Sequence, residues 1–425
     1  MLDRLPSSVL HCILSHAVPS PHPRFISRRY KYLLLYSSLS RSISRVAQQL
    51  LYTHIDIEDD RSATRFIRAV DDCAKARRLA FDETRSVRLS YSKYALSSTN
   101  VSWVLWRTPG AKEICLENLK VDPLGLSVAA SCQTLYLFNC ELLETSPITV
   151  YGSKPAVLQP ETWHFPRLTS LIFSCSYFVT HKRDWIPLTL LLNPVSLPAL
   201  KSLAFTYNDQ TSAPQFRWIA EQVTHLWLRR LPTTSPNNRQ HNAEPRVSDL
   251  PKEDLAFCSA HLLHLAVDLH QHADFDALTV LGTHNEDAIV NPRPSSLASS
   301  RPESSSLLRS LRLESPYLTT AERALLSALP SLPCLDDLSH LILSDLSQLP
   351  PSSARATKEK ASRETIRAEC EARRITVVEA LFHHPEKGYE AQKEDWRAWM
   401  RVCEWVDEEG DEDEEVPILM ERSGR

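Results

Sequence analysis

Histidine is the residue type in this sequence whose clustering could support metal chemistry. The densest imidazole cluster consists of His261, His264, His270 and His272. His261 and His264 have the spacing that can place two zinc ligands on one face of a helix. His264, however, directly precedes an apolar alternation at 265–267 that is typical of a strand, so one helix is not expected to hold both rings. No cysteine or carboxylate pattern completes a coordination set, and we therefore expect no metal site.

The sequence also lacks the motifs that would indicate catalysis. Phosphate-binding loops need glycine for close backbone approach, and the chain has only seven glycines, with neither GxGxxG nor GxxxxGK. GxSxG and HExxH are absent as well. No Ser/His/Asp set and no pair of acidic residues is singled out by its spacing. We expect a protein that is not an enzyme, with no catalytic residue and no cofactor.

Composition limits the architecture and the class of partner. A chain of 425 residues exceeds one ordinary core, so it is either multidomain or a repeat array. The net charge of −4 gives no reason to bind nucleic acid or membrane, and no apolar run reaches the about 18 to 20 residues that span a bilayer. Ten cysteines without a CxxC pair indicate buried thiols in a reducing compartment, cytoplasmic or nuclear.

A short apolar motif, two large apolar residues separated by one residue, recurs along the chain. It occurs at 54–57, 87–89, 114–116, 135–137, 168–173, 200–205, 226–228, 265–267, 308–313 and 338–343. The interval between motifs varies from 21 residues (Leu116 to Leu137) to 46 residues (Val267 to Leu313). This is an irregular repeat, longer on average than a standard leucine-rich repeat.

The intervals between the motifs carry helical patterns, which predicts an α/β fold. Helices are expected at 62–79, 100–106, 215–223, 250–260, 320–329 and 354–374, with a last strand at 375–378. Strand and helix in alternation imply a parallel sheet lined by helices, an irregular leucine-rich-repeat solenoid over 54–406. An amphipathic helix at 389–406, with Trp396, Trp399 and Trp405, is expected to close the end of the core.

Several polar segments interrupt or follow this pattern. Segments near 145–160, 232–252 and 284–306 are rich in Pro, Ser and Asn, and we expect disordered surface insertions there. A regulatory loop controlled by phosphorylation is the alternative. Residues 407–425 are expected to form an acidic, solvated tail.

Residues 1–53 differ from the repeats and predict a small helical module. An apolar stripe at 9–18 follows Pro6, which suits a first helical turn, and the proline-rich stretch 19–25 breaks the helix. Apolar residues recur at intervals of three and four from Leu35 to Leu51. We expect two or three packed helices that join the first repeat without a linker.

Two parts of this module carry a resemblance to a known family. They are Leu5-Pro6, Val9-Leu10 and Ile13-Leu14, and then Leu39-Ser40-Arg41-Ser42 with VAQQLLYTHI at 46–55. Together with the repeats, they resemble F-box proteins with leucine-rich repeats of the fungal type. The resemblance implies a non-catalytic substrate-recognition subunit of a Skp-cullin-F-box ubiquitin ligase, which binds a Skp-type adaptor, through it a cullin, and a protein substrate. It implies adaptor contacts by Leu5, Pro6, Val9, Leu10, Ile13, Leu14, Leu35 and Leu39.

The solenoid hypothesis also predicts where a partner binds. If the paired apolar residues of each motif face the core, the residue between them lies on the open concave face of the sheet. Four such residues are of types frequent in binding hot spots: Arg88, Tyr136, Trp227 and Arg312. We expect them to contact a partner, and Trp227→Ala to leave folding intact. Aromatic residues that are merely tolerated there or covered by a loop, and a scaffold protein independent of any ligase, are the alternatives.

Overall fold

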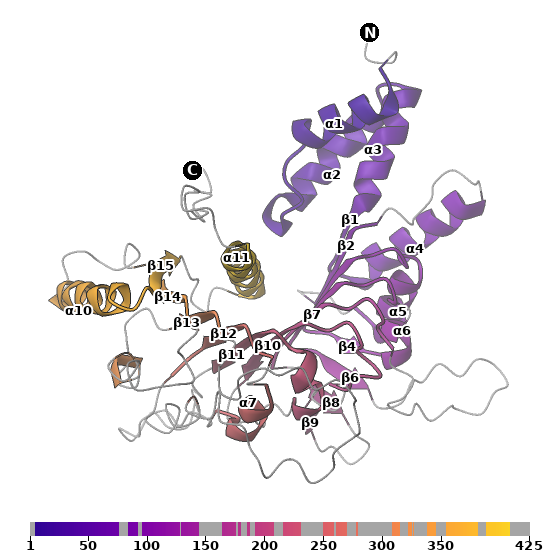
Figure 1. Ribbon diagram of the computed structural model, residues 1–425. Coiled ribbons are helices and arrows are strands. Elements are labelled where there is room, and N and C mark those ends of the chain that lie inside the picture. The colour runs from indigo at the N-terminus through magenta and orange to yellow at the C-terminus, as the bar shows by residue number, and fades with distance from the viewer. Residues whose placement is uncertain are drawn as a thin grey trace, which may run out of the picture. The chain divides into compact units, whose positions relative to one another are not determined.

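The computed structural model contains two compact units, residues 1–200 and 201–425, and each is described by itself (Figure 1). The described residues are 5–75, 84–91, 96–127, 129–143, 164–175, 177–179, 185–187, 192–207, 216–230, 250–258, 261–269, 278, 308–314, 322–324, 326, 338–345, 354–380 and 388–408. The predicted insertions at 145–160 and 284–306 lie outside them, as do 232–249 and most of the predicted acidic tail.

The first unit begins with a three-helix module. Its helices are α1 (Ser7–Ala17), α2 (Pro23–Ser37) and α3 (Arg41–Thr53). Pro23 stands in the first turn of α2, and the Ser40 hydroxyl accepts a hydrogen bond from the Ile43 backbone amide and caps α3. The helices share a buried apolar core formed by Leu10, Leu14, Val18, Leu33, Ile43, Val46, Ala47 and Leu50.

A parallel sheet follows α3 without an intervening loop, because α3 ends at Thr53 and β1 begins at His54. Its strands in this unit are β1 (His54–Ile57), β2 (Ser86–Ser90), β3 (Glu113–Glu117), β5 (Thr134–Phe138) and β7 (Ser170–Ser174). The helices α4 (Asp60–Lys75), α5 (Ser98–Trp106) and α6 (Pro123–Ser127) lie along one side of these strands (Figure 1). A smaller sheet contains β4 (Lys120–Val121), β6 (Glu141–Leu143), β8 (Tyr177–Val179) and β9 (Trp185–Pro187).

The turns after β3, β5 and β7 repeat one backbone conformation. Asn118, Asn139 and Cys175 directly follow these strands and have φ values of 55°, 50° and 50°. Asparagine tolerates this left-handed region better than most residues do. The Asn139 side-chain amide donates to Oδ1 of Asn118 at 2.8 Å, so the turns of two successive repeats are bonded to each other.

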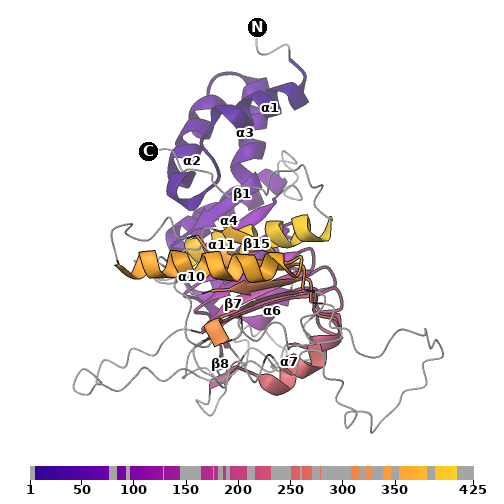
Figure 2. The same ribbon diagram turned by 60° about the vertical axis from the view of Figure 1, so that its left-hand side comes forward.

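The second unit continues the same strand–helix pattern. Its strands, all parallel, are β10 (Ser202–Tyr207), β11 (His225–Arg230), β12 (His264–Val267), β13 (Ser310–Leu313), β14 (His340–Ser344) and β15 (Thr376–Ala380). Its helices include the 3₁₀ helix η5 (Arg217–Gln222) and the α-helices α7 (Lys252–Cys258), α10 (Ala354–Glu371) and α11 (Tyr389–Asp407). Figures 1 and 2 show α11 and α7 on opposite sides of the strands.

The predicted α/β class with a parallel sheet is confirmed. Six of the ten apolar motifs lie within a strand, and the other four, at 168–173, 200–205, 308–313 and 338–343, have their last four residues in one. The helix expected at 215–223 is a 3₁₀ helix, and the one expected at 320–329 falls mostly outside the described residues. Among the helices that the structure describes, none combines the length and the apolar character needed to cross a membrane.

Candidate functional site

The eight residues expected to contact an adaptor divide between the surface and the core of the helical module. Val9 and Ile13 on α1 are 41% and 42% exposed, and Leu35 and Leu39 are 58% and 60% exposed. Pro6 is exposed and Leu5 is half-buried. Exposed apolar side chains of this size are available to a partner.

The predicted adaptor contact is wrong for Leu10 and Leu14. Both side chains are buried in the core shared by the three helices, so neither can reach a partner while the module is folded. The physical reason is the helical period, since positions 10 and 14 lie one turn apart on the side of α1 that faces α3, while 9 and 13 lie on the adjacent side.

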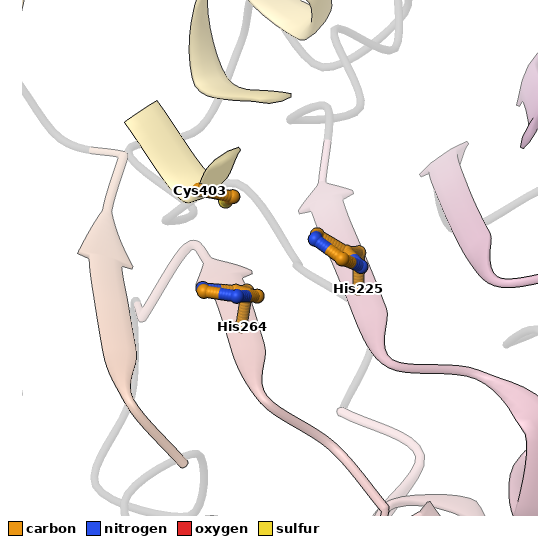
Figure 3. A group of neighbouring side chains, drawn as sticks. All are labelled: His225, His264 and Cys403. Atoms are coloured by element: carbon orange, nitrogen blue, oxygen red, sulfur yellow. The ribbon is translucent and has the colours of Figure 1, made fainter. Parts of the chain in front are cut away.

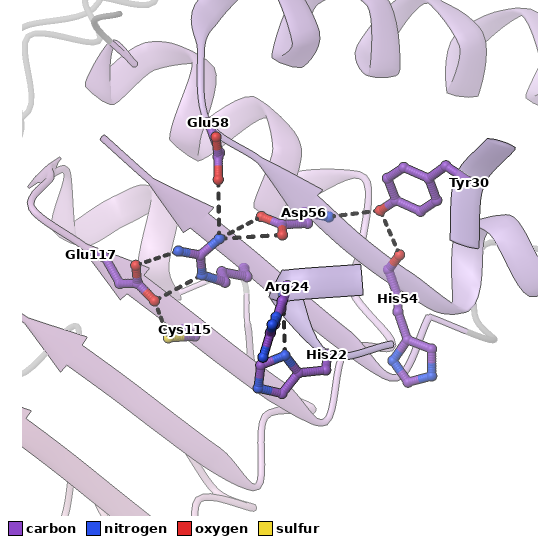
Figure 4. Close-up of polar contacts among 9 residues, drawn as sticks. His22, Arg24, Tyr30, His54, Asp56, Glu58, Cys115 and Glu117 are labelled. Atoms are coloured by element: carbon purple, nitrogen blue, oxygen red, sulfur yellow. Dashed lines mark hydrogen bonds and ion pairs between the residues drawn. The ribbon is translucent and has the colours of Figure 1, made fainter. Parts of the chain in front are cut away.

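Tyr30 fastens the module to the first strand. Its hydroxyl donates to the backbone carbonyl of His54 at 2.9 Å and accepts from the backbone amide of Asp56 at 3.0 Å. Burial raises the pKa of the phenol well above its usual value, so the hydroxyl keeps its proton. Figure 4 shows Tyr30 beside β1, where it joins α2 to the sheet.

Arg88 binds three carboxylates instead of standing open on the sheet. Its guanidinium donates to both oxygens of Glu117, at 2.9 and 2.7 Å, and to both oxygens of Asp56, at 3.0 and 3.2 Å. Glu58 lies 3.4 Å away, and Figure 4 shows the three acidic side chains converging. Burial raises the pKa of Asp56 to about 6, although Arg88 acts to lower it. Arg88 thus joins β1, β2 and β3, and its side chain is only 17% exposed.

The other three residues predicted on an open face are buried, and that expectation is wrong for them. Tyr136, Trp227 and Arg312 are all less than 5% exposed. The Tyr136 ring packs 5.9 Å from that of Phe138. Trp227 and Arg312 do lie on the side of the sheet opposite α7. That side is covered by α11, which buries both residues.

Aromatic and charged groups hold α11 against this face of the sheet. Trp396 stacks on Trp227 with ring centroids 5.8 Å apart, and Trp399 lies 6.0 Å from Trp227. Further along α11, Trp405 meets the ring of His340 on β14 edge-on at 5.2 Å. The helix predicted at 389–406 is therefore confirmed, but it covers strands β11 to β14 of its unit.

A compensated set of buried charges lies between these elements. Arg312 Nε is 2.8 Å from Oε1 of Glu314, and Arg229 lies 3.9 Å from Glu314 and 3.8 Å from Asp395 on α11. The Arg312 guanidinium also stands over the Trp227 ring at 4.7 Å. Burial raises the pKa of Glu314, whereas the two arginines act to lower it. Two cations and two acids, all nearly solvent-free, connect the sheet to α11.

One histidine of the cluster seen in the sequence, His264, pairs with a histidine of another strand. His261 is exposed, while His270 and His272 lie outside the described residues. His264 instead stacks on His225 of the neighbouring strand, with centroids 4.5 Å apart, and Cys403 of α11 faces both rings (Figure 3). Sequence reasoning missed His225 and Cys403. A signal existed for His225, because HLWL at 225–228 and HLAV at 264–267 put histidine at the same repeat position.

Two exposed tryptophans on α5 were also missed. Trp103 and Trp106 are 42% and 58% exposed, and their rings meet edge-on at 5.4 Å. Arg107 lies over the Trp103 ring at 4.9 Å and is held by an ion pair with Asp71 at 2.8 Å. Their i, i+3 spacing places them on one helical face, a signal that the sequence contained.

Comparison of the sequence with models of protein families and with curated proteins finds no match.

Proposed function

We propose that this chain is a non-catalytic substrate-recognition subunit of a Skp-cullin-F-box type ubiquitin ligase, acting in the cytoplasm or nucleus. The observation that carries the proposal is the concentration of exposed apolar side chains on the helical module. Of twelve large apolar residues that are exposed among the described residues, seven belong to α1, α2 or the turn after α2. They are Val9, Ile13, Phe25, Tyr32, Leu34, Leu35 and Leu39.

The module does not need these side chains for its own core. Eight other residues of the module form that core: seven of α1 to α3 that are less than 7% exposed, and Val18, directly after α1, at 7%. Large apolar groups left in water on one small module are typical of a protein interface. A Skp-type adaptor is the partner that the F-box resemblance suggests, with a cullin joined through it, and Val9, Ile13, Leu35 and Leu39 are the proposed contacts.

A direct hydrogen-bonded connection to the repeats also favours a receptor. Tyr30 bonds the backbone on both sides of Ile55 in β1, so the module and the first repeat form one body. A subunit that presents cargo to a ligase at a fixed position benefits from such a connection, because it raises the effective concentration of cargo at the ligase.

We propose that the substrate binds at α5, and no longer at the sheet face that the sequence predicted. Trp227 and Arg312 are buried and cannot meet cargo, whereas Trp103 and Trp106 are exposed next to Arg107. Tryptophan and arginine dominate the energetics of protein interfaces. A protein substrate is therefore proposed to contact Trp103 and Trp106.

Co-expression of the full chain with a Skp-type adaptor and affinity capture tests the adaptor contact. The pairs Val9→Ser/Ile13→Ser and Leu35→Ser/Leu39→Ser should each abolish capture while the circular dichroism spectrum and melting temperature stay unchanged. Val195→Ser, which changes an equally apolar and 74% exposed residue outside the module, is the matched control and should leave capture intact. Leu10→Ala is unsuitable, since removal of a buried leucine destabilises by about 2–5 kcal/mol and would lower capture through unfolding.

The same capture separates the ligase from a ligase-independent scaffold. A wild-type chain that is folded and retains cargo but never binds the adaptor contradicts the proposal and favours the scaffold. Cargo recovered with the wild-type chain should be lost with Trp103→Ala/Trp106→Ala, whereas Trp218→Ala, an exposed tryptophan of the other unit, should retain it.

A further inference from the structure

Three side chains of metal-ligand type meet between α11 and the sheet of the second unit. They are His225 at the start of β11, His264 at the start of β12 and Cys403 on α11, and their ligand atoms all lie within 4.8 Å of one another. His264 and Cys403 are fully buried and His225 is partly buried. Figure 3 shows the thiol directed toward the two imidazole rings.

Hydroxyl groups hold both rings by the same nitrogen. Nδ1 of His225 is 2.8 Å from the Thr224 hydroxyl, and Nδ1 of His264 is 2.8 Å from the Ser310 hydroxyl. The Nε2 atom of His225 is thereby left as its ligand atom, whereas Nε2 of His264 contacts Oδ1 of Asp407 and becomes a ligand atom only when that contact is broken. Metal-binding histidines are characteristically oriented by such a hydrogen bond from the second ring nitrogen.

A carboxylate stands beside the cluster. Oδ1 of Asp407, one helical turn after Cys403, is 3.2 Å from Nε2 of His264 and 3.0 Å from the guanidinium of Arg309. Asp407 therefore approaches the ring from the side on which its ligand atom lies. Two imidazoles and one thiol thus make a set of three ligands from three separate elements, and the Asp407 carboxylate contacts one of them.

From this arrangement we propose that His225, His264 and Cys403, joined by Asp407 once its carboxylate moves off Nε2 of His264, bind one zinc ion, which fastens α11 to strands β11 and β12. Thiolate and imidazole ligands favour zinc among the abundant divalent ions, whereas magnesium and calcium take oxygen ligands. A tetrahedral site of four protein ligands is the structural type. The ion would stabilise the packing of α11 on the sheet, whether or not the chain is part of a ubiquitin ligase.

The ligand atoms of His225, His264 and Cys403 need only a small contraction to accept the ion. Bonds of about 2.0 Å to nitrogen and about 2.3 Å to sulfur put ligand atoms roughly 3.3–3.6 Å apart. A separation of 4.8 Å or less then closes by a movement of about 1 Å, which rotation of the Cys403 and His225 side chains can supply. The stacked rings, now 27° apart in orientation, would tilt to point their lone pairs at one ion.

Binding must release a proton from the thiol. A cysteine binds zinc as the thiolate, so the thiol proton of Cys403 must leave. On binding, the S–H bond breaks, the sulfur–zinc bond forms and the proton passes to solvent. Neutral imidazoles give up no proton if Nδ1 already carries the hydrogen. One proton per ion is therefore the expected release near neutral pH.

The test uses the full chain, stripped with a chelator and titrated with zinc chloride against a chromophoric chelator. We expect one ion per chain with a Kd of about nanomolar or tighter, one proton released and a higher melting temperature. Cobalt(II) in place of zinc should give the thiolate charge-transfer absorption and the intense visible bands of a tetrahedral site. This spectrum needs no substitution and so stays informative if a variant fails to fold.

Variants assign the ligands. Cys403→Ser and His264→Gln should each weaken zinc binding by more than about a hundredfold, and Ser310→Ala, which removes only the positioning hydroxyl, by roughly 10- to 100-fold. Cys370→Ser, another buried cysteine of this unit, and His340→Gln, in the same register row on β14, are the matched controls and should bind as the wild type does. A wild-type Kd weaker than about micromolar, a cobalt spectrum without thiolate absorption, or undiminished binding by Cys403→Ser would overturn the proposal.

Discussion

The indole ring of Trp396 on α11 lies parallel to that of Trp227 on β11, with an interplanar angle of 6° and centroids 5.8 Å apart. Both side chains are buried, at 2% and 4% exposure. Truncation of either to alanine removes a large apolar contact and leaves a cavity. We therefore expect Trp227→Ala and Trp396→Ala each to lower the free energy of unfolding by about 3–5 kcal/mol, measured by urea denaturation.

A double-mutant cycle isolates the contribution of this ring pair. The double variant should be less destabilised than the sum of the single variants by about 0.5–1.5 kcal/mol. Trp218→Ala is the control, because that side chain is 64% exposed and its loss should change stability by less than about 0.5 kcal/mol. Full stability in Trp227→Ala would show that α11 does not cover β11 in solution.

Arg312 gives a second prediction about the same interface. Its guanidinium is fully buried beside Glu314, with 2.8 Å between Nε and Oε1. Arg312→Met preserves much of the volume but leaves the buried Glu314 without its closer arginine, while Arg229 lies 3.9 Å away. We expect a loss of about 3–5 kcal/mol in the free energy of unfolding near neutral pH.

The double variant Arg312→Met/Glu314→Gln should recover most of this loss, since it removes the acid together with its partner. The penalty of the single variant should also shrink in mild acid, because burial already raises the pKa of Glu314 and protonation makes the group neutral. An equal penalty in the single and double variants would mean that Arg312 contributes by packing alone.

The strands were predictable from the sequence, whereas the packing of α11 over them was not. Pairs such as Val87 and Leu89 alternate with a period of two and are buried, as the motif predicts. The residue between two such positions can be a tryptophan or an arginine whether it meets water or another helix. Local periodicity carries no information on which strands a distant helix will cover, so the burial of Trp227 and Arg312 was missed.

The candidate site shows the same limit. The repeat position shared by His225 and His264 could have paired these rings from the sequence, since equivalent positions are neighbours in a parallel sheet. No spacing rule relates either histidine to Cys403, which comes from α11. In the helical module, periodicity identified the apolar residues, but it did not separate the buried Leu10 from the exposed Ile13 until the position of α3 was known.

Asp56 predicts a pH dependence of folding in the first unit. Burial raises its pKa to about 6 from an ordinary 3.8, while Arg88 lowers it and Glu58 and Glu117 raise it. A carboxyl group of this kind stabilises fully below its unfolded pKa, and the contribution is lost as the pH rises through about 6. Since one pKa unit corresponds to about 1.4 kcal/mol, the unfolding free energy of the wild type minus that of Asp56→Asn should fall by up to about 3 kcal/mol between about pH 4 and pH 7.

Glu58→Gln is a second variant for this measurement. Glu58 contacts Arg88 and raises the pKa of Asp56, but its side chain is 52% exposed, so its replacement should reduce the pH dependence without abolishing it. A difference between the wild type and Asp56→Asn that stays constant or grows with pH would show that pairing with Arg88 outweighs burial.

Gly125 on α6 gives a prediction about packing within the first unit. A Cβ atom at this position would lie 2.0 Å from the Ser102 hydroxyl oxygen, 2.5 Å from its Cβ and 2.9 Å from its Cα on α5. The last of these is a backbone atom, so α5 and α6 would have to separate. Although alanine is the better helix former, we expect Gly125→Ala to lower the free energy of unfolding by about 1–3 kcal/mol.

Ser102→Gly removes two of the three clashing atoms, so the double variant should be more stable than the sum of the single variants predicts. Additive effects in chemical denaturation would mean that the two helices do not approach this closely.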